Sequence, residues 1–156
     1  MEFIKDLFGN AILISASLGW FSAEIIKIFF KCIRLKSLKG LKFSDLFASG
    51  GMPSSHSAAV CALSAAIAYV HGISSPLFAI SATFSAIVMY DAGGVRKEAG
   101  EQAKALNMIM RDMFSGNPEY SNNAFKELIG HTKSQVFVGA LLGIGVGLLY
   151  TFLVGA

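Results

Sequence analysis

The sequence predicts an all-α integral membrane protein, a bundle of about four transmembrane helices in a single domain of 156 residues. Hydrophobic residues make up 54% of the chain and charged residues only 15%, whereas a soluble domain has about a quarter charged residues. Asp, Glu, Lys and Arg are also missing from three long blocks, residues 7–23, 46–90 and 134–156. A helix needs roughly 20 apolar residues to cross a bilayer core, so these blocks allow several crossings.

The first three spans are expected at residues 8–30, 53–70 and 77–91. The second follows the sequence Gly-Gly-Met-Pro at 50–53, in which Pro suits the first turn of a helix. The sequence His-Gly-Ile-Ser-Ser-Pro at 71–76 separates the second span from the third, because Gly and Pro together stop a helix. Both central spans are short, which favours a hairpin packed among the other helices.

The fourth span is expected at residues 135–154. Its glycines recur every fourth residue and form a small-residue face that allows close helix packing in lipid: Gly139, Gly143 and Gly147. The connections are then 31–52 and 92–134. The second connection is expected to be helical over 96–113, where Ala, Glu, Lys, Leu and Met dominate, with a break at Asn-Pro and a further short helix at 122–129.

The basic residues predict the orientation. The two large connections together carry eleven of the 13 Lys and Arg residues, whereas the other side of the membrane carries only Lys5. By the positive-inside rule, both connections lie in the cytoplasm and both termini lie outside. We therefore expect a multi-pass protein of the cytoplasmic (inner) membrane.

Three polar clusters interrupt the apolar sequence, at residues 50–57, 90–97 and 130–135. Each lies at the predicted cytoplasmic end of a span, so the three are expected to meet at one face of the membrane. A helix N-terminus with free N–H groups and neighbouring hydroxyls is suited to an anion. Taken singly, the first cluster is explained equally well by helix capping, and the second by an interfacial belt of Tyr and basic residues.

Taken together, these strings resemble a known superfamily. Met-Pro-Ser-Ser-His-Ser-Ala at 52–58 and Gly-His-Thr at 130–132 resemble motifs of type 2 phosphatidic acid phosphatases and vanadium-dependent haloperoxidases. With Tyr-Asp-Ala-Gly-Gly-Val-Arg at 90–96, they resemble the small divergent membrane branch of that superfamily over nearly the whole chain. The resemblance implies a histidine phosphatase that needs no metal and no cofactor. It implies His131 as the nucleophile that forms a phosphohistidine and His56 as the acid that protonates the leaving oxygen. It also implies that Ser54 and Ser55 bind phosphate oxygens.

The chain departs from the superfamily pattern around His131. The pattern has an arginine six residues before this histidine and an aspartate four residues after it, where this chain has Phe125 and Gln135. Gln135 can accept a hydrogen bond from His131, and Asp91 or Glu127 are the alternatives for the missing carboxylate.

The departures also affect the predicted phosphate ligands. Arg96 is expected to replace the missing arginine, with Lys97 beside it. Lys27 and Arg34 have the spacing of the superfamily's first motif, although Leu35 follows where the motif has proline. We count both among the candidate phosphate ligands.

Three functions remain open at this point. The leading hypothesis is a phosphatase for a lipid phosphate monoester such as phosphatidylglycerophosphate, phosphatidic acid or an isoprenoid phosphate, because basic loops attract anionic headgroups. The alternative is a non-catalytic protein that binds or translocates anionic lipid. A metal-dependent enzyme using Asp91, Glu98 and Glu101 is weaker, because the basic residues between them oppose a divalent cation. No nucleic-acid partner is expected, and a homodimer is left open because four short helices are few to enclose a site.

Overall fold

The computed structural model describes residues 2–35, 51–113 and 130–156, and these residues form helices with no strand among them. The elements are α1 (Glu2–Gly9), α2 (Ala11–Leu35), α3 (Ser55–His71), α4 (Pro76–Tyr90), the π-helical turn η2 (Asp91–Val95), α5 (Arg96–Met113) and α7 (Lys133–Val154). The predicted all-α fold is confirmed, and so is the helix expected at 96–113. The short helix expected at 122–129 lies outside the described residues.

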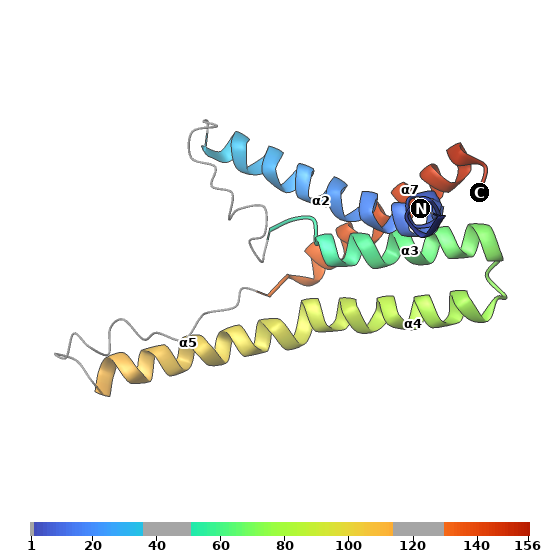
Figure 1. The fold of residues 1–156 in the computed structure, drawn as a ribbon. Coiled ribbons are helices and arrows are strands. Elements are labelled where there is room, and N and C mark those ends of the chain that lie inside the picture. The colour runs from blue at the N-terminus through green and yellow to red at the C-terminus, as the bar shows by residue number, and fades with distance from the viewer. Residues whose placement is uncertain (1, 36–50, 114–129) are drawn as a thin grey trace.

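Three stretches of helix are long and apolar enough to cross a membrane: Ala11–Ile33, Pro76–Met113 and Lys133–Val154. The first begins later than expected, because the side chain of Asn10 accepts a hydrogen bond from the N–H of Leu13 and starts α2 there. The helix α3 has 17 residues, slightly fewer than the roughly 20 that a spanning helix needs. It is nevertheless the most enclosed helix, with contacts to α2, α4 and α7 (Figure 1).

Close packing of α7 on α3 explains the glycine repeat. A Cβ atom added at Gly139, Gly143 or Gly147 would collide with the backbone of Ser54, Ala58 or Ala62 respectively. The residue numbers increase by four along both helices in the same direction, so α3 and α7 run parallel with their backbones in contact. Gly19 of α2 approaches Ala58 and Ala62 from another side. In lipid, where apolar burial drives helix association little, such contact between small residues is a principal source of stability.

Buried hydroxyl groups join α3 to α4. The Ser64 and Ser85 hydroxyls lie 2.9 Å apart, and Ser85 also donates to the carbonyl of Val60 at 2.9 Å. The turn between the two helices follows its sequence: Gly72 ends α3 with φ of 80°, and Ser75 caps α4, whose first residue is Pro76. The hairpin expected from the break at 71–76 is therefore present.

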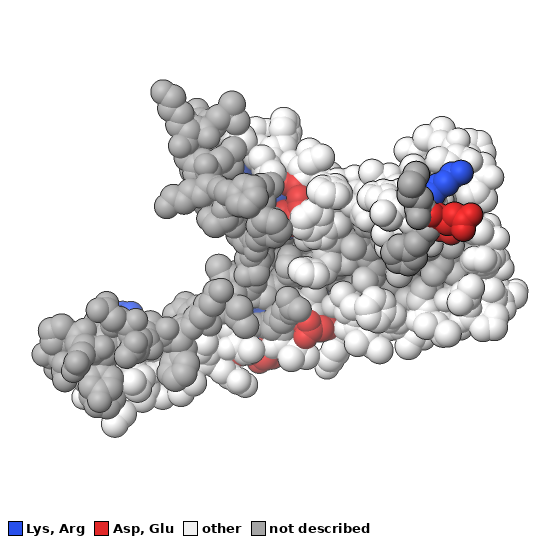
Figure 2. Space-filling model, viewed as in Figure 1, with Lys and Arg blue, Asp and Glu red and all other residues white. Residues whose placement is uncertain are grey.

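The helices α4, η2 and α5 form one long rod, whose α5 end projects beyond the rest of the bundle (Figure 1). Both chain termini lie near the opposite end, where α3 turns into α4 (Figure 1). The visible surface over the middle of the bundle is almost entirely uncharged, and its Lys, Arg, Asp and Glu residues gather toward the ends (Figure 2). This distribution is the one expected of a protein whose middle lies in lipid.

Candidate functional site

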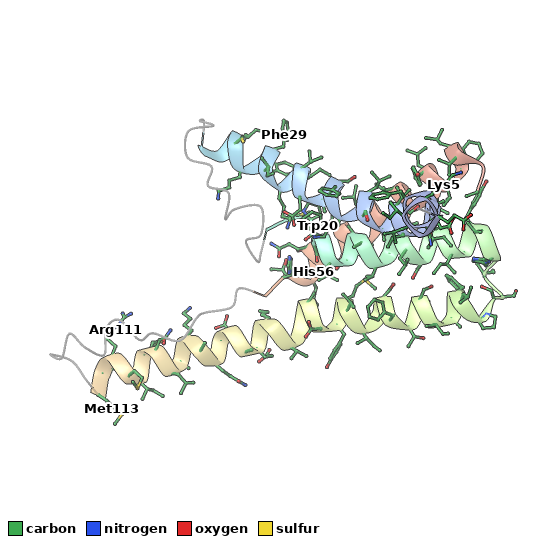
Figure 3. The ribbon with its side chains drawn as sticks, in the orientation of Figure 1. Lys5, Trp20, Phe29, His56, Arg111 and Met113 are labelled. Atoms are coloured by element: carbon green, nitrogen blue, oxygen red, sulfur yellow. The ribbon has the colours of Figure 1, made fainter. Side chains whose placement is uncertain are left out.

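The first polar cluster forms the start of α3. Ser54 is its N-cap: the Ser54 hydroxyl oxygen accepts hydrogen bonds from the N–H and the hydroxyl of Ser57, at 3.4 and 3.0 Å. Pro53, Ser54, Ser55 and Ser57 are buried, whereas His56 is exposed. The side chain of His56 lies at the start of α3 in the region where α7 also begins (Figure 3). The hydroxyl of Ser54 is thus used to cap the N-terminus of α3.

The third cluster forms the start of α7 and touches the first. Thr132 caps α7, and the Gln135 side chain accepts a hydrogen bond from the Thr132 N–H at 2.9 Å, which completes a capping box. The backbone N–H of Ser54 donates to the carbonyl of Gln135 at 3.0 Å. The N-termini of two parallel helices therefore lie side by side. Each carries the equivalent of roughly half a positive charge, so this end of the bundle favours an anion.

The second cluster fixes the segment that enters α7. The backbone N–H of His131 donates to the carbonyl of Ala92, in η2, at 3.0 Å. Gly130 lies against the backbone of Lys97, which leaves no room for a Cβ atom. Two backbone contacts thus hold His131 between the first turn of α7 and the junction of α4 with α5.

His131 is buried, with 5% of its surface exposed. The residue has interactions of its own, but its Nε2 atom is enclosed and makes no hydrogen bond among the described residues. Asp91, which opens η2, is half-buried and also interacts with its surroundings. An orienting contact from Gln135 or Asp91 to His131 stays a prediction.

A fourth segment, α2, contributes a charged pair that reaches the start of α3. Lys27 Nζ donates to Glu24 Oε1 at 2.7 Å and to the hydroxyl of Ser55 at 3.2 Å. Gly51, with φ of 93°, lies against the Lys27 stem: a Cβ there would be 3.3 Å from Lys27 Cδ. Lys27, predicted from motif spacing to be a phosphate ligand, is therefore in contact with the first cluster.

For the remaining predicted phosphate ligands, the structure gives the position of each on its helix. Arg34 lies on α2 seven residues beyond Lys27, roughly 10 Å further along the helix. Arg96 is the first residue of α5, and Lys97 is exposed beside it. The side chains of Arg34 and Arg96 and the whole of Glu127 lie outside the described residues. Glu24 was not counted among the predicted site residues, although its i, i+3 spacing from Lys27 indicates mutual neutralisation and ionisable groups in a membrane helix are functional candidates.

The arrangement limits the chemistry that Lys27 can perform. A buried lysine beside a serine suggests a dyad in which a neutral amine takes the hydroxyl proton. Here Lys27 Nζ already donates to the Glu24 carboxylate at 2.7 Å, and an ammonium donates hydrogen bonds but accepts none. Lys27 is therefore suited to binding an anion rather than to activating Ser55.

A metal site gains no support from the part of the chain that the structure describes. No three His, Cys, Asp or Glu side chains are grouped there so that they could hold an ion. Asp91, Glu98 and Glu101 accordingly form no such group.

These features define a class: a small all-α membrane protein whose polar residues converge where two parallel helices begin. The chain belongs to the divergent PAP2 family, whose sequence model matches residues 8–146. It is also similar to the "Uncharacterized membrane protein YuiD" of Bacillus subtilis (strain 168). The two are 38% identical over 157 residues, which cover 94% of this chain and 98% of that protein. No solved structure matches the chain. The expected membership of the divergent membrane branch is confirmed.

Proposed function

We propose that the protein is a metal-independent membrane phosphatase that hydrolyses a lipid phosphate monoester through a phosphohistidine. One observation carries the proposal: two helix N-termini and the Lys27 ammonium converge at the segment that holds the buried His131. Helix N-termini and an ammonium bind phosphate by charge and by N–H donation. An imidazole in the same region supplies a nucleophile of the kind that the family resemblance implies.

In the proposed reaction, a nitrogen of His131 attacks the phosphorus and the bond to the lipid oxygen breaks. His56 gives its proton to that oxygen, so the lipid leaves as an alcohol. Water then attacks the phosphohistidine, His131 is regenerated, and inorganic phosphate is released. The exposure of His56 suits an acid that exchanges protons with solvent between turnovers. Lys27, Ser55 and Arg96 are assigned to the phosphate oxygens.

We place the site at the cytoplasmic side of the inner membrane. The described basic residues of α5 lie at the end of the bundle where α3 and α7 start, whereas Lys5 lies at the other end (Figure 3). The positive-inside rule assigns the more basic end to the cytoplasm. The substrate is then an inner-leaflet lipid such as phosphatidylglycerophosphate or phosphatidic acid. The homodimer considered from the sequence stays a prediction.

The deciding experiment measures phosphate release from short-chain lipid phosphates by the purified protein in detergent. The wild-type protein should turn over in the presence of EDTA and be inhibited by vanadate, which mimics five-coordinate phosphorus. His131→Ala should abolish turnover, and it should also abolish the acid-labile phosphoprotein trapped by rapid quenching. His71→Ala is the matched control, because His71 is exposed at the far end of α3 and should be dispensable.

The runner-up is a protein that binds or translocates anionic lipid without hydrolysing it. It is favoured by the Gln135 side chain, which is uncharged and already bonded to Thr132 in the capping box. An uncharged partner stabilises an imidazolium less than a carboxylate does. Lipid phosphate binding by the wild-type protein, with no phosphate release and no loss of binding in His131→Ala, would establish this alternative.

A further inference from the structure

A buried carboxylate and a partly buried ammonium lie together in α2, next to the site. Only 9% of the Glu24 side chain and 12% of the Lys27 side chain are exposed. Ionisable groups at this depth are costly to bury, and in membrane proteins they commonly serve a function. The phosphatase mechanism proposed above uses Lys27 but assigns nothing to Glu24.

The hydrogen bonds of Lys27 show how Glu24 restrains it. An ammonium has three N–H donors. One is given to Glu24 Oε1 and the second to the Ser55 hydroxyl, on a different helix. The third has no acceptor among the residues that the structure describes. The Lys27 stem is confined by the Gly51 backbone, so the ammonium is held at the first turn of α3.

We propose that Glu24 is a positioning residue: its ion pair with Lys27 holds the ammonium on Ser55, so that the third N–H is available to a phosphate oxygen. The inference rests on the proposed phosphatase function and extends it. Without the Glu24 carboxylate, the long and flexible Lys27 side chain would lose the contact that fixes its ammonium, and its third N–H would no longer point in one direction. Glu24 thus positions the ammonium of the site without touching the substrate.

The proposal predicts a defect in binding rather than in turnover. Glu24→Gln should raise KM, and the inhibition constant of inorganic phosphate, by about tenfold, the effect of losing roughly one charged hydrogen bond. The kcat should stay within about twofold, because the His131 and His56 chemistry is unchanged. Glu24→Asp keeps the charge on a shorter stem and should recover part of the loss. It also tests the proposal if Glu24→Gln fails to fold.

A double-mutant cycle separates positioning from general stability. In a Lys27→Met protein, adding Glu24→Gln should cause no further rise in KM, because its effect acts through Lys27. Ser85→Ala is the structural control: it removes the buried α3–α4 hydrogen bonds and should lower the unfolding temperature while leaving KM unchanged.

The possible results separate a failure of the positioning role of Glu24 from a failure of the proposed phosphatase function. Wild-type protein that neither hydrolyses lipid phosphate nor binds inorganic phosphate would overturn both. If the wild-type protein is active, the role of Glu24 alone can be overturned. It would be overturned if Glu24→Gln left KM unchanged, tightened phosphate binding or lowered only kcat. It would also be overturned if Glu24→Gln raised KM equally in the Lys27→Met background.

Discussion

The backbone N–H of Ser54 donates a hydrogen bond to the carbonyl of Gln135, at 3.0 Å. The two residues belong to motifs far apart in the sequence, and each stands at the start of its own helix. Their bond fixes the N-terminus of α3 beside that of α7. It therefore brings His56 and the segment that carries His131 to the same end of the bundle.

Gly143 should be intolerant of any side chain. A Cβ there would overlap the backbone of Ala58, so Gly143→Ala forces α7 away from α3 and should cost about 1–3 kcal/mol of stability. The measurement is thermal unfolding in detergent. Gly145→Ala, on the same helix with open space around its Cβ, should be neutral or slightly stabilising. Equal effects of the two substitutions would refute the predicted packing role.

Gly130 should matter for activity more than for stability. Its replacement by alanine pushes the segment away from the Lys97 backbone and displaces His131, which the neighbouring hydrogen bond to Ala92 otherwise fixes. A misplacement of about 1 Å can cost roughly 100-fold in rate, and we expect a loss of that order in kcat. Gly94→Ala is the control, because a Cβ there meets nothing. Normal turnover in Gly130→Ala would contradict the predicted placement of His131.

His56→Ala should have an effect that depends on the leaving group. General-acid catalysis typically contributes about 10²–10⁴-fold, and it is needed most when the departing oxygen is a poor leaving group. We expect a loss of about 100-fold or more with a lipid phosphate and less than about tenfold with nitrophenyl phosphate. The ratio of the two kcat/KM values is the readout. A uniform loss on both substrates would show that His56 is not the acid.

The orientation can be tested with two single cysteines at opposite ends of the bundle. Gln102 is exposed on α5, and Ser74 is exposed in the turn between α3 and α4. In a background carrying Cys32→Ser and Cys61→Ala, a membrane-impermeant thiol reagent should label Ser74→Cys in intact cells. Gln102→Cys should be labelled only after lysis. The reverse pattern would place the site on the outer side of the membrane and would rule out an inner-leaflet lipid as the substrate.

Much of the fold could be predicted from the sequence because lipid imposes simple rules. Uncharged blocks, the break at Gly72 and Pro76, and the helix-forming composition of 96–113 each led to an element that is present. The way in which α3 and α7 pack against each other could be predicted less well. The period of Gly139, Gly143 and Gly147 indicated a packing face, but not that α3 runs parallel beneath it.

The candidate site could be predicted only in part. Three clusters were expected at one face, and the backbone bonds of Ser54 and His131 join them. The side-chain contacts depend on tertiary packing, which a linear motif does not contain. Ser54 and Gln135, selected as ligand and orienting residue, are bonded within the two helix caps. The reach of Lys27 to Ser55, and the hold of Glu24 on Lys27, likewise depend on how α2 crosses α3.

The parallel pairing of α3 with α7 also bears on how the protein is made. During synthesis α3 emerges well before α7, so its backbone along Ser54, Ala58 and Ala62 is at first uncovered. The proposed anion site needs both helix starts, and His131 itself precedes α7 by only a few residues. A nascent chain that stops before residue 130 therefore lacks both His131, the proposed nucleophile, and the second helix N-terminus. The proposed site is therefore complete only after α7 has been translated and inserted.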